Sequence, residues 1–86
     1  MAFIYPPANA SLVLPKSYDG KPTAIIAEVA HRDKEQLLFW YLDGKRIANT
    51  RVFHQQQLQP EPGEHVLLVI DQKGRQISRK FTLLSR

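Results

Sequence analysis

The fold is decided by the stretch Pro60-Glu61-Pro62-Gly63-Glu64-His65-Val66-Leu67-Leu68-Val69-Ile70-Asp71-Gln72-Lys73-Gly74-Arg75, which contains a turn, a long strand and a second turn. Proline fixes φ and glycine tolerates positive φ, so Pro62-Gly63 predicts a bend. Residues 66–70 are β-branched or leucine and span the length of a strand. Gln72-Lys73-Gly74 then predicts a short hairpin into a strand over 75–83. This stretch therefore indicates an all-β protein.

Further strand-like segments lie on the N-terminal side of this stretch. In residues 23–31, Ile25, Ala27 and Val29 alternate onto one face. The most apolar segment, 37–42, is followed by Asp43-Gly44, and an Asp-Gly pair between two strands is a strong hairpin signal.

The remaining segments are shorter. Pro6-Pro7 predicts a kink or a bulge in a first strand, because proline cannot donate to a ladder. A further strand is expected at 11–14, a loop at 18–22, and a weak strand or loop around Gln55-Gln56-Gln57. The total is about seven short strands at intervals of roughly 8–12 residues, which predicts a small immunoglobulin-like or fibronectin III-like β-sandwich.

Size and composition limit the classes that the chain can belong to. Its 86 residues predict a single domain over 1–86. The absence of cysteine excludes disulfides and thiolate metal sites. No apolar run approaches the ~20 residues that a membrane-spanning helix needs. The net charge of +4 is compatible with an ordinary solvated surface or with attraction to an anionic partner.

The titratable side chains give no catalytic or metal-binding pattern. The spacing of His31, His54 and His65 matches no metal-ligand motif. We expect His65 to donate a hydrogen bond to a loop carbonyl, and Asp43 and Asp71 to cap the turns that follow them. The sequence therefore predicts no catalytic residue, no metal site and no cofactor.

A candidate interaction surface is predicted instead. In a strand, Trp40 faces the opposite way from Phe39 and Tyr41, so we expect Trp40 in the core and the other two on the outer face. Exposed aromatic side chains mark docking surfaces. The last strand adds basic side chains, so the candidate surface comprises Phe39, Tyr41, Arg75, Arg79 and Lys80.

Four motifs, in order, resemble the C-terminal domain of the penicillin-binding protein 1C family of bifunctional peptidoglycan synthases. They cover nearly the whole chain and consist mainly of turn residues. The motifs are Tyr5-Pro6-Pro7-Ala8-Asn9-Ala10, Trp40-Tyr41-Leu42-Asp43-Gly44-Lys45, Pro60-Glu61-Pro62-Gly63-Glu64-His65 and Asp71-Gln72-Lys73-Gly74-Arg75.

The resemblance implies a C-terminal accessory module of a larger, membrane-anchored chain at the periplasmic face of the bacterial inner membrane. Parents of this kind carry a glycosyltransferase and a transpeptidase domain, the latter with a Ser-x-x-Lys nucleophile motif. That motif is absent here, because Ser11, Ser17 and Ser78 are followed at the third position by leucine, glycine and phenylalanine. The implied role is therefore non-catalytic, and the implied partners are the neighbouring transpeptidase domain, a periplasmic protein or peptidoglycan.

Two alternatives remain from the sequence. The first is a free-standing interaction module that recruits a partner strand to an exposed sheet edge. The second is a small β-barrel that binds single-stranded nucleic acid through Trp40, Tyr41 and basic residues. An enzyme is the least favoured class, because no constellation of nucleophile, base and acid is present.

Overall fold

The computed structural model describes residues 1–13, 24–33 and 35–84. These residues contain no helix of the length and apolarity needed to cross a membrane. The loop expected at 18–22, and Leu14 at the end of the second expected strand, lie outside the described residues. The described strands are β1 (Ala2–Tyr5), β2 (Ala10–Val13), β3 (Ile25–Ala30), β4 (Leu38–Leu42), β5 (Lys45–Thr50), β6 (Gln55–Leu58), β7 (Gly63–Asp71) and β8 (Gln76–Leu84).

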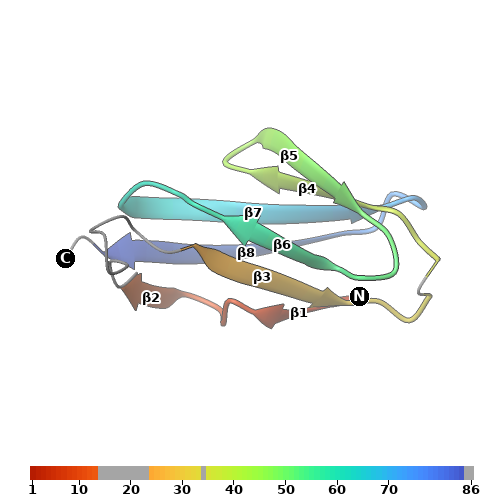
Figure 1. Cartoon of the computed structure of the whole chain (residues 1–86), viewed down its shortest axis with the longest axis horizontal. Coiled ribbons are helices and arrows are strands. Elements are labelled where there is room, and N and C mark those ends of the chain that lie inside the picture. Colours follow the sequence, from red (N-terminus) through yellow and green to blue (C-terminus); the bar gives the residue numbers. More distant parts are fainter. Residues whose placement is uncertain (14–23, 34, 85–86) are drawn as a thin grey trace.

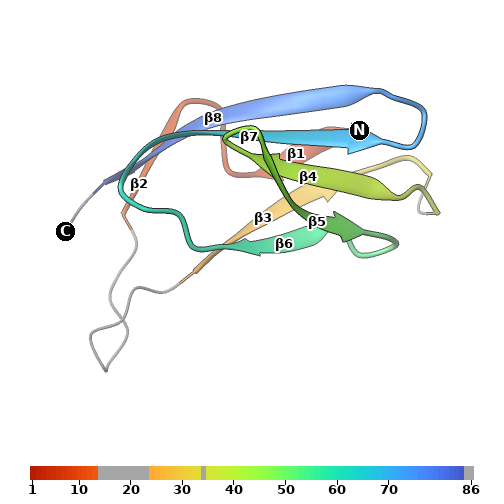
Figure 2. The ribbon, with the colours of Figure 1, turned by 90° about the horizontal axis from the view of Figure 1, so that it is seen from above.

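The strands form a sandwich of two sheets, which confirms the predicted all-β fold (Figures 1 and 2). One sheet has the strand order β2-β8-β7-β4-β5, and the other has the order β1-β3-β6. In Figure 2, β8, β7 and β4 lie on one side, and β3 and β6 lie on the other. About seven strands were expected and the described residues form eight, because the glutamine run left open between strand and loop forms β6 beside β3.

The N-terminal segment contributes to both sheets. β1 pairs antiparallel with β3, whereas β2 pairs parallel with β8, and the chain crosses between the sheets at Pro6 and Pro7. The kink predicted at these prolines is therefore confirmed as the place where the strand changes sheet. Pro6 follows a cis peptide bond and is buried.

The core lies between the two sheets and follows the alternation expected from the sequence. Trp40 is 0% exposed, and its neighbours across the ladder are Val69 on β7 and Ala48 on β5. Its core position was predicted and is confirmed. The other buried apolar residues of this cluster are Ile25, Ala27, Val29, Leu38, Leu58, Leu67, Val69 and Phe81.

The Asp-Gly hairpin has the backbone geometry that its sequence predicts. Asp43 and Gly44 have φ values of 52° and 84°, which are positive at both central positions, as in a type I′ turn. Asp43 accepts a hydrogen bond from the Val66 backbone N–H at 2.9 Å through its side chain, and its own N–H donates to the Val66 carbonyl at 2.9 Å. The turn between β4 and β5 is thereby attached to the neighbouring strand β7.

Candidate functional site

Phe39 and Tyr41 lie on the outer face of the five-stranded sheet, as the alternation predicts. Both side chains are half-buried rather than fully exposed. The reason is their cross-strand neighbours: Phe39 is opposite Ile70, and Tyr41 is opposite Leu68. Aromatic and aliphatic side chains in such pairs cover part of each other's surface.

The outer face carries more apolar residues than the sequence analysis selected. Val66, Leu68 and Ile70 share the parity of β7 that points away from Leu67 and Val69 of the core. Together the set forms the outer apolar face: Phe39, Tyr41, Val66, Leu68 and Ile70. The signal for the missed members was the unbroken run of apolar residues 66–70, since a strand with one solvated face alternates instead.

The basic residues of the candidate surface lie in three different places. Lys80 is exposed, opposite Val66 and beside the outer apolar face. Arg75 lies in the turn after β7, where its Nε donates to Asp71 at 3.0 Å. Arg79 has the inward parity of β8, its guanidinium lies 5.1 Å from the centre of the Phe3 ring, and its Nε is buried without a partner among the described residues.

The candidate surface is therefore divided by the fold. Phe39, Tyr41 and Lys80 share one face, whereas Arg75 and Arg79 do not join them there. Arg46, which the sequence analysis did not select, lies opposite Tyr41 and is exposed beside the outer apolar face.

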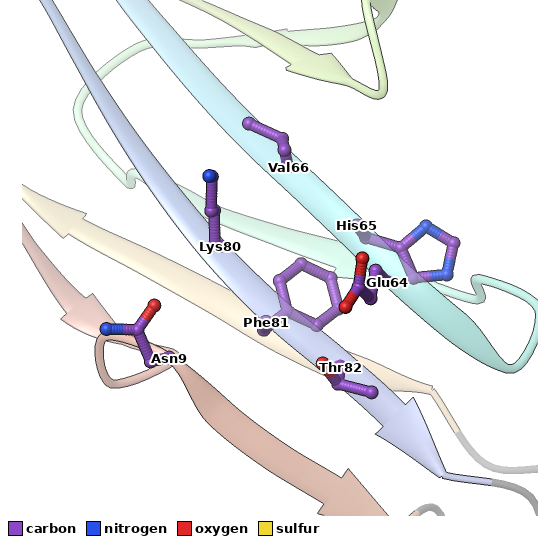
Figure 3. A pocket seen from close by; sticks show the side chains of 7 residues that line it. All are labelled: Asn9, Glu64, His65, Val66, Lys80, Phe81 and Thr82. Carbon is purple, nitrogen blue, oxygen red and sulfur yellow. The ribbon is translucent and has the colours of Figure 1, made fainter.

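An open hollow of about 430 Å³ lies next to Lys80 (Figure 3). Residues from β7, from β8 and from the loop before β2 line it: Asn9, Glu64, His65, Val66, Lys80, Phe81 and Thr82. The hollow is lined by one basic side chain, Lys80, and one acidic side chain, Glu64. Thr82 adds a hydroxyl group and Asn9 adds an amide. In the described part of the chain, no three histidine, cysteine or acidic residues come together as a metal site.

His65 joins the turn before β7 to the β4–β5 hairpin. Its Nδ1 lies 2.6 Å from Asp43 Oδ2, and its Nε2 lies 2.6 Å from the Glu61 carbonyl oxygen. The bond to a loop carbonyl was predicted and is confirmed. Both ring nitrogens face acceptors, so both must donate, which favours the doubly protonated imidazolium.

This geometry determines the direction of two pKa shifts. Partial burial disfavours the charge on His65, but its bonds to Asp43 and Glu61 outweigh burial and raise the pKa of His65 above 6.5. Burial likewise opposes the charge on Asp43, yet bonds from His65 and from the Val66 N–H lower the pKa of Asp43 below 3.8. Both shifts favour the charged forms of the two side chains, and therefore favour an ion pair between them.

We expect the His65–Asp43 pair to stabilise the fold more below pH 6.5 than above it. Because the pKa of folded His65 is raised, its contribution is complete below the unfolded value of 6.5 and is lost as the pH rises through the folded pKa. Urea unfolding of the wild type and of His65→Gln from pH 5.5 to 9 measures this, and the difference in unfolding free energy should shrink with rising pH.

His54 makes the variant comparison necessary. Burial and the neighbouring His31 lower the pKa of His54, so its contribution to stability changes with pH in the opposite direction. The pH dependence of wild-type stability alone contains the contributions of both His54 and His65. A difference between wild type and His65→Gln that stays constant or grows with pH would contradict the assignment of His65 as the proton-binding group.

Asp71 organises the other end of β7. Its Oδ1 accepts the N–H groups of Lys73 and Arg75 at 2.9 and 3.0 Å, which confirms the predicted turn cap. Its Oδ2 accepts from Arg75 Nε at 3.0 Å and from His31 Nε2 at 3.1 Å. Burial opposes the charge, but these bonds outweigh it and lower the pKa of Asp71 from 3.8 to about 2.

The two turn aspartates are too far apart to act as a catalytic pair. Asp43 is bonded to Val66, and Asp71 ends the same strand five residues later. At ~3.3 Å per residue this separates them by roughly 16 Å. Asp71 caps the turn that follows it, whereas the Asp43 carboxylate bonds to Val66 and His65 on β7. The turn cap predicted for Asp43 is therefore wrong, because a neighbouring strand supplies its donors. Both carboxylates stabilise structure and provide no acid–base pair.

The comparisons with known proteins agree with this structural reading. The model of the Penicillin-Binding Protein C-terminus Family matches residues 1–81. The chain belongs to this family. The four resembling motifs all lie within the match, and the structure places them at the crossing between sheets, the β4–β5 hairpin, the turn before β7 and the turn after it. The motifs therefore correspond to turns that fix the sandwich.

The fold of this penicillin-binding protein C-terminus domain is also found in a solved structure. A fibronectin(III)-like module of Clostridium thermocellum CbhA superposes with a TM-score of 0.65, covering 99% of this chain and 94% of that chain. The two share 11% sequence identity, so the likeness shows the fold alone. No curated protein matches the chain.

Proposed function

We propose that the chain is a non-catalytic accessory domain of a bacterial peptidoglycan synthase, and that its outer apolar face docks on the neighbouring transpeptidase domain. Family membership supports the first part. In this proposal the domain is held at the periplasmic face of the inner membrane by a membrane-anchored parent chain, where peptidoglycan is assembled.

The observation that carries the docking proposal is that β7 is apolar on both faces. Leu67 and Val69 point into the core, and Val66, Leu68 and Ile70 point out of the sandwich. Strands with this composition are typical of sheets covered on both sides. Phe39 and Tyr41 extend the apolar strip onto β4.

The surroundings of the strip have the composition of an interface rim. Along β8 the residues opposite the strip are Gln76, Ser78 and Lys80, and along β5 they are Arg46 and Asn49. An apolar centre with a polar and charged border is the usual anatomy of a protein–protein interface. Large aromatic side chains at such a centre contribute most of the binding energy.

Photo-crosslinking in the parent synthase tests this proposal. With p-benzoylphenylalanine in place of Tyr41, we expect crosslinks that mass spectrometry maps to the transpeptidase domain. The matched control carries the same group in place of Ile4, which is exposed on β1 in the other sheet. Crosslinks from position 4 that equal or exceed those from position 41 would contradict docking through the outer apolar face.

Binding to the wall polymer is the second candidate, favoured by the net charge of +4 and by Lys80 and Arg46 beside the strip. Charge attraction of this kind weakens as salt is added. Co-sedimentation of the chain with purified peptidoglycan sacculi at low salt, lost at high salt and unaffected by Leu68→Ser, would favour this candidate over domain docking.

A further inference from the structure

β5 and the turn that follows it form a second exposed surface, which meets the outer apolar face at Arg46. We propose that this β5 edge, defined as β5 and residues 51–53, binds an extended acidic segment of a partner protein that adds as a further strand. The inference concerns the chain's own surface and does not depend on the parent enzyme or on docking to a transpeptidase domain.

The position of β5 in the sheet supplies the backbone for such binding. β5 is the last strand in the order β2-β8-β7-β4-β5, and β4 covers one of its sides. An edge strand presents a row of N–H and C=O groups that can pair with another chain. Its six residues extend about 20 Å, which is enough to pair with a short peptide segment.

The charge of the β5 edge selects the chemistry of the partner. Residues 44–60 contain Lys45, Arg46 and Arg51 and no aspartate or glutamate. All three basic side chains belong to exposed residues, and no ion pair joins any of them to another described residue. Acidic side chains on an added strand would complement this edge and accelerate encounter.

The same charges disfavour a second copy of this chain as the partner. Two β5 edges brought together would bring the basic side chains of both copies close to one another, and like charges on neighbouring strands are destabilising. Lysine on an edge strand is a common protection against self-association. An acidic partner segment would instead be attracted to these basic side chains.

The turn after β5 adds an exposed aromatic side chain, which protection against self-association does not require. Phe53 is 82% exposed, the highest value among the large apolar residues described as exposed. Its N–H donates to the Arg51 carbonyl at 2.8 Å, which closes a three-residue turn with Val52 at φ 71°. A β-branched residue at positive φ is strained, and such strain is retained where surrounding contacts impose it.

Buried contacts on both sides impose this conformation. Before the turn, Thr50 Oγ1 accepts from Trp40 Nε1 at 2.8 Å, and it is also hydrogen-bonded to His54 Nδ1 at 2.8 Å. After the turn, the His54 carbonyl accepts from the Val29 N–H at 3.0 Å. Phe53 is therefore presented by a turn held at both ends, which lowers the entropy lost when it enters a partner's pocket.

Selection of peptides on the 86-residue chain tests the proposal. The probe is a phage-displayed library of random peptides of about 12 residues, long enough to span the edge strand. We expect the enriched peptides to combine aspartate or glutamate with apolar residues. Enrichment of basic or uncharged peptides, or no enrichment, would overturn the proposal.

Matched variants then locate the binding site. The affinity of the best synthetic peptide, measured by fluorescence anisotropy, should fall about tenfold or more in Arg51→Glu and in Phe53→Ala. It should be unchanged in Lys73→Glu and Leu84→Ala, which alter an exposed lysine and an exposed apolar residue elsewhere. Circular dichroism checks that each variant is folded, and equal losses in the control variants would overturn the assignment to the β5 edge.

Hydrogen exchange separates strand addition from simple charge attraction. If the peptide adds as a strand, amides of β5 that face away from β4 become protected in the complex. Unchanged hydrogen exchange in β5, or binding of inorganic polyphosphate as tight as that of the peptide, would show that the edge binds through charge attraction alone. Either result would overturn strand addition whatever the outcome of crosslinking in the parent synthase.

Discussion

Replacing Trp40 with alanine is expected to remove a large part of the free energy of unfolding. The Trp40 side chain is fully buried between the sheets, and its Nε1 donates to Thr50 at 2.8 Å. Truncation of a buried tryptophan or phenylalanine costs about 3–5 kcal/mol. The whole free energy of unfolding of a domain this small is on the order of 5–10 kcal/mol. About a third or more of the free energy of unfolding therefore depends on this one side chain.

Thermal unfolding followed by circular dichroism measures the effect. We expect Trp40→Ala to lower the midpoint by about 12–40 °C, since each kcal/mol shifts a domain of this size by about 4–8 °C. Phe53→Ala is the matched control, because it removes an aromatic side chain that is exposed. A Trp40→Ala midpoint close to that of Phe53→Ala would contradict the position of Trp40 in the core.

Much of the fold was predictable because its signals are local. Asp43-Gly44 predicts a hairpin because both residues adopt positive φ readily, and both do so here. Trp40 was assigned to the core from the alternation of β4 alone. The bond from His65 to a loop carbonyl was expected from its position beside Pro62-Gly63.

Arg79 shows that a local signal can also be overlooked. It shares the parity of Ile77, Phe81 and Leu83 on β8, and the structure places it on the inner side beside Phe3. The alternation of β8 therefore separates Arg79 from Lys80, which were predicted to share one surface. A cation stacked on an aromatic ring can occupy such a position because the ring face attracts it.

Other features depend on contacts between distant residues and could not be read from the sequence. Pro6-Pro7 indicated a kink, but nothing local shows that β2 would pair parallel with β8. The bond between His31 and Asp71 joins residues 40 positions apart. The outer apolar face likewise needs the register of β4 against β7, which places Phe39 opposite Ile70.

Substitution of Asp71 by asparagine is expected to destabilise the chain strongly although the side chain keeps its shape. Oδ1 of Asp71 accepts two backbone N–H groups, and Oδ2 faces the donors Arg75 Nε and His31 Nε2. Asparagine keeps only one of these oxygens as an acceptor and carries an NH2 group in place of the other. Its amide group would face two donors in a buried site, which leaves polar groups unsatisfied. We expect the thermal midpoint to fall by on the order of 10 °C.

The pH dependence of this effect distinguishes loss of the charge from loss of packing. Because the pKa of folded Asp71 is lowered from 3.8 to about 2, the carboxylate's contribution is complete above 3.8 and is lost as the pH falls through about 2. The stability difference between wild type and Asp71→Asn should therefore shrink as the pH is lowered from 5 towards 2. Glu64→Gln, which neutralises an exposed carboxylate on the same strand, is the control and should change little. If the stability difference between wild type and Asp71→Asn persists unchanged at pH 2, the negative charge of Asp71 does not stabilise the end of β7.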